Sequence, residues 1–416
     1  MTTSFSDAQL SSLMANWEVN RDRSGGIADR SIRFHFQAID AGFSGSPVYR
    51  VSAGNATAGN ATADASNVWA LKAFSTSVAV ERMNHCGRLL GAASEHCDLL
   101  APPLRTRDTE ATWVETLGFR WELSRWIPGT PLAIDAPAES ILLGGEAIGR
   151  VHRALAEALS QEERPAANAP YIAMPTVPRC VTDRIERLRH LGLFLDRMKS
   201  DRRSPASLAV ALADQLSGEN PGQPASDFRC LRLAESLVQA RELIVRRWDE
   251  LTPTFLDRLQ EIQRHSDAMA TSWVLRDVHR GHVLFVPGEV RGGEPGQRVT
   301  GLLDYDAIDR DSPAADIARW SGDFSGENQP IGLVSTDRAG SEADVLLDAA
   351  VAGYRQICPF PKRQRQLARL LIDVNCLGGL TNWLLWLTFE NRQFAGRACA
   401  IRDRIIHLIA SVCRIC

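Results

Sequence analysis

Three titratable side chains, Asp277, His282 and Asp304, lie in short, mostly apolar segments in the second half of this 416-residue chain. The first two belong to Trp273-Val-Leu-Arg-Asp-Val-His-Arg-Gly-His-Val-Leu-Phe285, and the third belongs to Gly301-Leu-Leu-Asp-Tyr-Asp306. Two short strands joined by a turn would bring the three side chains to one edge. A carboxylate that accepts a hydroxyl proton, beside two ligands for Mg²⁺, is the set that phosphoryl transfer requires. The alternative is an ordinary hairpin that carries surface aspartates.

Taken together, the two segments resemble the catalytic segments of the protein-kinase-like fold, in its aminoglycoside phosphotransferase and choline kinase branch. That branch typically has His-Gly-Asp-Leu-His-Pro-Gly-Asn, followed later by Ile-Asp-Trp-Asp. This chain has Leu275-Arg-Asp-Val-His-Arg-Gly-His282, followed by Leu303-Asp-Tyr-Asp306. It therefore keeps the aspartates, the second histidine and the glycine. Leu275 replaces the first histidine, and His282 replaces the metal-binding asparagine.

The resemblance extends over about residues 32–390 and implies a two-lobed α+β fold. In that fold a small antiparallel-sheet N-lobe precedes a larger, mainly helical C-lobe. The resemblance also implies roles for the three residues. Asp277 would orient and deprotonate a substrate hydroxyl, while Asp304 and His282 would hold Mg²⁺ against the phosphates of ATP.

The resemblance and the composition together predict the domain organisation. We expect an N-terminal lead at residues 1–30, a nucleotide-binding lobe at 31–127, and a catalytic and acceptor-binding lobe at 128–416. Residues 160–228 are rich in Pro, Ala, Ser and Arg. We interpret them as a variable helical insertion in the larger lobe, where such helices help to wall the acceptor site in relatives.

A glycine-bearing turn, Ala41-Gly-Phe-Ser-Gly-Ser46, separates two strand-like runs in the smaller lobe. Gly42 and Gly45 have no side chain in the way, so backbone N–H groups of such a turn can approach phosphate closely. The turn resembles the loop that covers the nucleotide in kinases. We therefore assign Gly42, Ser44, Gly45 and Ser46 to nucleotide binding; a plain hairpin turn is the alternative.

Lys72 lies within the apolar run Val68-Trp-Ala-Leu-Lys-Ala-Phe74, which predicts a strand. Lysine is rarely placed among apolar residues without a partner. In the kinase pattern a strand lysine clamps the α- and β-phosphates and pairs with a helix glutamate. By that resemblance we assign Lys72 to the phosphates and Glu81, in the following helix, as its partner. An edge-strand lysine and a surface glutamate are the alternatives.

Two further motifs carry expectations from the same resemblance. Asp316, in Pro313-Ala-Ala-Asp-Ile-Ala318, stands where relatives have an aspartate that supports the catalytic loop through hydrogen bonds. Trp383 and Trp386 follow each other at helical spacing and could line a pocket, but aromatic stripes are more often core, and we favour core.

Composition limits the function classes. The net charge of −3 and the lack of a basic stripe give no case for nucleic acid. The N-terminus lacks the apolar core of a signal peptide, and the nine singly scattered cysteines are an odd number. Both features favour the cytoplasm and reduced thiols. The apolar stretch 374–389 is interrupted by asparagine and glycine, so we expect a buried helix and no membrane span. The sequence carries no signal for an oligomeric state.

The expected function is therefore that of an ATP-dependent small-molecule kinase with Mg²⁺, a phosphotransferase whose acceptor is an alcohol group. The competing class is a catalytically inactive kinase-like module that binds a nucleotide or a partner. Position 282 distinguishes the two, because histidine stands there in place of asparagine. The acceptor stays open, since aminoglycosides, choline, amino-alcohols and sugars are all phosphorylated on this fold.

Overall fold

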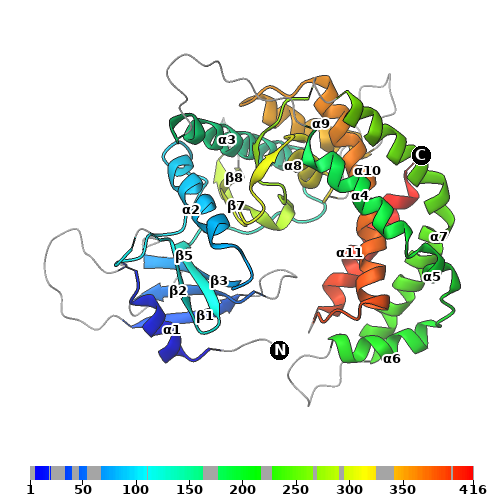
Figure 1. The fold of residues 1–416 in the computed structure, drawn as a ribbon, viewed down its shortest axis with the longest axis horizontal. Coiled ribbons are helices and arrows are strands. Elements are labelled where there is room, and N and C mark those ends of the chain that lie inside the picture. Colours follow the sequence, from blue (N-terminus) through cyan, green and yellow to red (C-terminus); the bar gives the residue numbers. More distant parts are fainter. Residues whose placement is uncertain are drawn as a thin grey trace, which may run out of the picture.

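The structure is a computed structural model of the chain. It describes residues 5–17, 19, 33–39, 46–53, 67–109, 111–162, 177–216, 227–265, 269–289, 295–324, 342–394 and 397–415. Figure 1 shows an antiparallel sheet at one end of the molecule and an assembly of helices at the other. This arrangement confirms the predicted α+β fold with a small sheet lobe and a larger helical lobe. The predicted lobe boundaries stay predictions.

The smaller lobe is a five-stranded antiparallel sheet in the order β1-β2-β3-β5-β4. Its elements are α1 (Asp7–Met14), β1 (Phe34–Ile39), β2 (Val48–Ala53), β3 (Val68–Ser75), α2 (Val80–Ser94), β4 (Trp113–Thr116) and β5 (Phe119–Arg125). One face buries Leu71, Trp121 and Leu123 against α1. Because strand side chains alternate, Lys72 in β3 and Glu122 in β5 point to the opposite face.

The larger lobe begins with α3 and ends with α11. Its helices are α3 (Ala138–Glu162), α4 (Arg179–Gly192), α5 (Leu195–Ser200), α6 (Pro205–Leu216), α7 (Asp227–Arg264), α8 (Ala314–Ser321), α9 (Glu342–Arg355), α10 (Lys362–Leu384) and α11 (Ala398–Cys413). A single apolar core joins them, and Leu89 and Leu90 of α2 also belong to it. Helix α2 thus connects the two lobes, and Figure 1 shows it between the sheet and α3.

Two short hairpin-like pairs in the larger lobe carry the catalytic segments. They are formed by β6 (Ser272–Val274) with β9 (Asp309–Asp311), and by β7 (Val283–Glu289) with β8 (Pro295–Leu302). The loop between β6 and β7 contains the 3-10 turn η3 (Arg280–His282). The segment after β8 runs through Asp304 to β9. The predicted strand–turn–strand arrangement is therefore present.

The connection between the lobes is fixed by a glycine. Gly129 has φ +131°, and a Cβ there would lie 2.8 Å from the carbonyl oxygen of Phe285. The close approach lets Thr130 exchange two backbone hydrogen bonds of 2.9 Å with Phe285 in β7. The Pro-Gly sequence after β5 is thus where the chain passes from the sheet lobe to the hairpin formed by β7 and β8.

Three helix ends and breaks are set by local contacts. Helix α2 begins after Ala79, while Ser75 and Ser77 form a serine turn of their own before it. Within the expected helical insertion, residues 179–200 form two helices, α4 and α5. The helix that carries both tryptophans ends at Leu384 and continues as a π-turn, η5 (Leu385–Phe389).

One helical stretch, Lys362–Phe389, is long and apolar enough by composition to cross a membrane, and 67% of its most apolar window is buried within the protein. Helix α10 packs against α7, α8 and α11, which accounts for its apolar surface. The prediction of a buried helix for residues 374–389 is confirmed. Trp383 is 6% exposed and belongs to the core, as expected.

Candidate functional site

Each of the two motif segments contains one residue with left-handed backbone: Arg276 has φ 66° and Asp304 has φ 62°, and Leu117 and Asn391 share this conformation elsewhere. Aspartate tolerates this region, but it costs energy for arginine and persists only where the surroundings impose it. The Arg276 side chain is held by an ion pair with Asp183 of α4 and by a 3.2 Å contact with Asp311. Strain of this kind clusters at functional sites, so the backbone marks the same two segments as the sequence motifs do.

The two lobes meet at Lys72. Its Nζ lies 2.9 Å from Oδ1 of Asp304 and 2.7 Å from Oδ2 of Asp306. Burial lowers the pKa of Lys72, but the charges of Asp306 and Asp304 outweigh it, and the pKa lies above its usual value. Burial raises the pKa of Asp304, and Lys72 outweighs that effect, so the pKa is lowered. The ammonium and Asp304 therefore both stay charged.

A second pair of carboxylates surrounds the same ammonium. The pKa of Asp306 shifts the other way. Burial and the charge of Asp304 raise it, although Lys72 acts to lower it. Glu122 of β5 lies directly opposite Lys72 in the sheet. Burial, and then the charge of Asp306, raises the pKa of Glu122 to about 8. This site thus holds more negative than positive charge.

The predicted Lys72–Glu81 ion pair is replaced by these contacts. Glu81 is exposed at the start of α2, and no ion pair joins it to Lys72 among the described residues. The neighbouring Arg82 points to the catalytic segment instead and donates hydrogen bonds to the carbonyl oxygens of Asp306 and Ile308. Helix α2 therefore docks on the segment after Asp304 through an arginine.

The geometry fixes the tautomer of neutral His282. Its Nδ1 lies 2.9 Å from the carbonyl oxygen of Asp277, which can only accept, so Nδ1 carries the proton. Its Nε2 then presents a lone pair, 3.5 Å from Oδ2 of Asp304. Two acceptors that face each other need a proton or a cation between them. The arrangement therefore fits a divalent ion held by Asp304 and His282.

These two ligands would not hold a metal alone. Among the described residues no three His, Cys, Asp or Glu side chains are grouped as a metal site. Magnesium at phosphoryl-transfer sites needs no such cage, because phosphate and water complete its coordination. The donor set here is one carboxylate and one imidazole, and the imidazole favours manganese or zinc over magnesium.

His279 packs against His282, with ring centroids 3.6 Å apart. Its Nδ1 accepts a 3.0 Å hydrogen bond from the Gly281 N–H. Burial, and then the neighbouring His282, lowers the pKa of His279 to about 4. His279 is therefore neutral at ordinary pH and serves to hold the turn that carries His282.

Asp277 is the candidate base, and its side chain is 46% exposed. It forms an ion pair with Arg319 of α8. The sequence motifs did not predict this arginine, which lies directly after the Asp-Ile-Ala pattern. Arg319 thus holds the half-exposed Asp277 carboxylate in place.

The expected support from Asp316 is confirmed. Its Oδ2 accepts a 2.7 Å hydrogen bond from the backbone N–H of Leu275 and lies 2.9 Å from Nε2 of His152. Nδ1 of His152 lies 3.1 Å from the Tyr354 hydroxyl. These four groups are buried, so the strand that leads into Asp277 is tied to α3 and α9. His152 is a buried structural histidine.

The remaining predicted nucleotide residues lie at the edge of the described chain. Gly42, Ser44 and Gly45 are outside the described residues, and so is most of the turn. Ser46 is half-buried immediately before β2. Ser46 therefore lies beside the strand that pairs with β3, where Lys72 lies. Their assignment to nucleotide binding stays a prediction.

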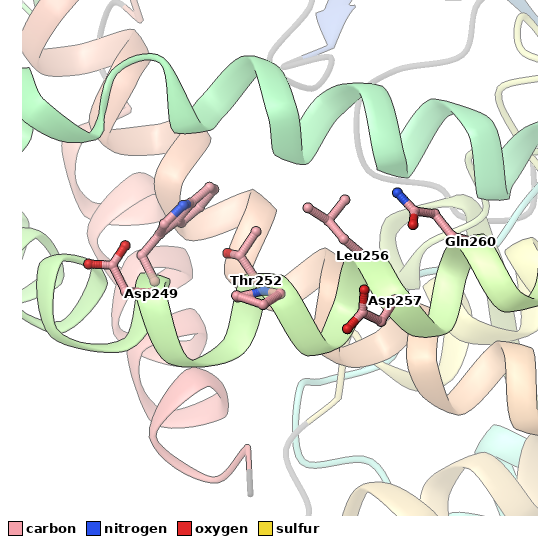
Figure 2. Close-up of a pocket in the computed structure, with 7 residues that line it drawn as sticks. Asp249, Thr252, Leu256, Asp257 and Gln260 are labelled. Atoms are coloured by element: carbon pink, nitrogen blue, oxygen red, sulfur yellow. The ribbon is translucent and has the colours of Figure 1, made fainter.

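A separate groove of about 410 Å³ runs along α7 and contains none of these residues. Figure 2 shows Thr252, Leu256 and Gln260 in sequence along the helix, beneath a neighbouring helix. Pro253 is one of its lining residues, and its ring nitrogen has no hydrogen to donate within the helix. Nothing in the groove matches the chemistry at the catalytic loop.

Comparison with known proteins supports the fold. No family model and no curated protein sequence matches the chain. Among solved structures, spectinomycin phosphotransferase in complex with ADP and spectinomycin is 13% identical, with 99% of each chain covered and a TM-score of 0.53. Amicoumacin kinase is 12% identical (90% of this chain, 89% of the other, TM-score 0.46), and choline kinase from Cryptosporidium parvum is 12% identical (91% and 90%, TM-score 0.39).

The fold and site define a class. Over nearly its whole length the chain has the kinase-like fold of spectinomycin phosphotransferase, and the resemblance predicted from the catalytic segments is confirmed at the level of fold. The activity has to be argued from the site itself, because one fold carries many functions.

Proposed function

We propose that the protein is an ATP-dependent kinase that transfers the γ-phosphoryl group to the hydroxyl of a small molecule in the cytoplasm. One observation carries the proposal. A chain of contacts runs from Lys72 of the sheet lobe through Asp304 and His282 to the backbone carbonyl of Asp277. It supports a phosphate clamp, a metal position and a candidate base on adjoining segments, the groups that phosphoryl transfer requires.

Each residue has a role that follows from its contacts. Lys72 would bind the phosphates while it keeps Asp304 in place. Asp304 and His282 would hold the Mg²⁺ ion, which neutralises phosphate charge when bound. Asp277 would accept the hydroxyl proton. Placement and charge supply most of the acceleration in such reactions, so no covalent intermediate is needed.

The likeness to known structures is consistent with this proposal at the level of donor and acceptor class. The spectinomycin phosphotransferase structure contains ADP and a small-molecule substrate. By analogy, ATP would bind between the sheet lobe and the catalytic loop, and the acceptor would bind on the helical side. The site lies where the two lobes touch, which fits that division.

An inactive kinase-like module that binds nucleotide or a partner is the second candidate. The observation that favours it is His282, because imidazole is a poorer ligand for magnesium than the amide oxygen of asparagine. The two candidates differ in turnover and agree in nucleotide binding.

The test combines both readouts. We expect wild type to bind ATP and turn it over in the presence of hydroxylated acceptors, with manganese at least as effective as magnesium. His282→Asn should shift the preference toward magnesium by about tenfold, since one ligand bond changes from nitrogen to oxygen. Asp98→Asn, at an exposed loop position, is the matched control. ATP binding without turnover, with either metal and in both proteins, would establish the inactive module instead.

A further inference from the structure

Arg280 begins the turn that carries His282, and it is neither a ligand nor a base in the proposed mechanism. It stands where the aminoglycoside phosphotransferase and choline kinase pattern has proline, two residues before the position where His282 replaces asparagine. Its backbone N–H donates a 3.0 Å hydrogen bond to Oδ2 of Asp323. Proline has no N–H, so a chain with proline at this position could not form that bond.

Asp323, which follows α8, is a buried and charged acceptor for that bond. Its side chain is 8% exposed and forms an ion pair with Arg404 of α11. Burial acts to raise the pKa of Asp323, but Arg404 and the other positive partners outweigh burial, so the pKa lies below its usual value. A hydrogen bond to a charged acceptor is stronger than one between neutral groups. The turn is thus tied firmly, through Asp323, to α11.

The side chain of Arg280 contacts the segment that joins the two lobes. Its Nη1 donates a 3.0 Å hydrogen bond to the carbonyl oxygen of Leu132, which is buried between β5 and α3. The same segment exchanges two hydrogen bonds with β7 through Thr130. One residue therefore joins the catalytic turn to the connection between the lobes and, through Asp323, to α11.

The turn also contacts the segment that carries Asp304. The N–H of His282 donates a 2.9 Å hydrogen bond to the carbonyl of His279, and the carbonyl of His282 accepts a 2.8 Å bond from the N–H of Leu303. Nε2 of His282 lies 3.5 Å from Oδ2 of Asp304. Metal–ligand distances vary by only about 0.2 Å between protein sites, so a small displacement of the turn would separate His282 from an ion bound to Asp304.

We infer that Arg280 is a positioning residue for the proposed kinase reaction: it holds the turn in the place where the His282 ring reaches Asp304. This inference rests on the proposed function. The ring is held at Nδ1 by the carbonyl of Asp277, so it cannot rotate to follow a displaced turn, and the turn itself has to be held. The departures from the family pattern at positions 280 and 282 then form a pair.

Three variants at position 280 separate the backbone bond from the side-chain bond. Arg280→Ala removes the bond to Leu132 and keeps the N–H. Arg280→Pro also removes the N–H, and the backbone can accept proline because residue 280 begins a 3-10 turn and His279 before it is extended, with φ −136° and ψ 176°. Arg280→Lys keeps a cationic donor. Arg298→Ala, at an exposed position of β8, is the matched control.

Metal binding is measured by electron paramagnetic resonance of Mn²⁺ with AMP-PNP, nucleotide binding by calorimetry without metal, and kcat and the KM of the acceptor with ATP and Mn²⁺. We expect Arg280→Pro to weaken Mn²⁺ binding and to lower kcat by about ten- to a hundredfold, the effect of a small misplacement at a reacting centre. The metal-free nucleotide affinity and the acceptor KM should stay unchanged. Arg280→Ala should lose less, and Arg280→Lys least.

A double-mutant cycle tests whether Arg280 acts through His282. In the His282→Asn background, Arg280→Pro should change the Mn²⁺ affinity by less than about threefold, because the ring that the turn positions is absent and the two contributions are coupled. A role in stability alone predicts a lower free energy of unfolding in both backgrounds with full metal affinity. If Arg280→Pro does not fold, the cycle is run with Arg280→Ala.

The outcomes separate the inference from the kinase proposal. If the variants at position 280 bind Mn²⁺ and turn over as Arg298→Ala does, the inference is wrong and the kinase proposal stands. Weaker Mn²⁺ binding in Arg280→Pro, with no turnover by wild type, would support the role of Arg280 in placing His282 and refute the kinase proposal. An equal loss of Mn²⁺ affinity in both backgrounds, or no Mn²⁺ binding by wild type with AMP-PNP, would overturn the inference.

Discussion

On one side of the catalytic loop, the single ammonium of Lys72 faces the carboxylates of Asp304, Asp306 and Glu122. On the other side, Arg319 pairs with Asp277, and Arg276 pairs with Asp183, Asp309 and Asp311. The first side lacks positive charge, and in the proposed mechanism a divalent ion would supply it. On the second side the carboxylates of the protein itself match the arginines. The difference teaches that the charge imbalance of the site lies on the side of the sheet lobe.

The largest expected effect comes from the residue between the two sides. Asp277→Asn keeps the shape of the side chain but removes the base and its negative charge. We expect turnover to fall by about a hundred- to ten-thousandfold, the usual contribution of a general base. Steady-state kinetics at saturating ATP measures it, with Asp98→Asn as the control. Turnover equal to wild type in Asp277→Asn would remove Asp277 from the mechanism.

The next effect breaks the carboxylate-rich side. Lys72→Ala removes the ammonium from Asp304 and Asp306, so binding of ATP loses a charge-assisted contact and meets more negative charge. We expect the affinity for Mg·ATP to fall by about ten- to a hundredfold, since a hydrogen bond to a charged group contributes about 1.5–3 kcal/mol. Calorimetry measures it.

The control for that experiment is Lys199→Ala, because Lys199 is partly exposed and pairs with Asp249 far from the loop. An ATP affinity that is the same in Lys72→Ala and Lys199→Ala would show that the nucleotide binds elsewhere. If Lys72 only neutralises the carboxylates, Lys72→Ala should lower the stability of the protein and leave nucleotide binding unchanged.

The last effect is on stability, not on catalysis, and concerns the sheet carboxylate opposite Lys72. The pKa of Glu122 is raised from an ordinary value of 4.5 to about 8 in the folded protein. Between these values the folded state binds the proton more tightly than the unfolded chain does. Stability therefore falls as the pH rises from about 4.5 to 8, by at most about 1.4 kcal/mol per pH unit for this one group.

Glu122→Gln should remove that dependence, so the variant gains stability over wild type as the pH rises through this interval. Denaturant unfolding at several pH values between 5 and 8 measures the difference, with Glu115→Gln on the neighbouring strand as the control. If the stability difference between Glu122→Gln and wild type is constant with pH, Glu122 does not hold the proton in the folded state.

The catalytic segments could be predicted from the sequence because they are local. Asp277 and His282 occupy one loop, and in the structure the His282 ring lies at the carbonyl of Asp277. The apolar run around Lys72 likewise predicted a strand lysine that needs a partner. The two-lobed fold followed from the resemblance of these short motifs, without any similarity detectable over the whole sequence.

The partners of these residues could not be predicted, because they depend on how distant elements pack. Lys72 and Asp304 are 232 positions apart. Lys72 pairs with Asp304 and Asp306, and not with Glu81, because α2 docks on the segment after Asp304 through Arg82. Arg319 meets Asp277 only because α8 packs beneath the loop. Glu122 did leave a signal in the sequence, because it is a carboxylate between the apolar residues Trp121 and Leu123.

The most direct measurement follows the phosphorus atoms. ³¹P nuclear magnetic resonance of ATP, Mg²⁺ or Mn²⁺, enzyme and a hydroxylated acceptor reports donor and product together. The account predicts that the γ-phosphoryl signal of ATP declines while a new phosphomonoester signal and ADP grow in equal amounts, and only when both metal and acceptor are present. Nucleotide binding without any phosphomonoester, across a set of acidic, neutral and cationic acceptors and with both metals, would contradict it.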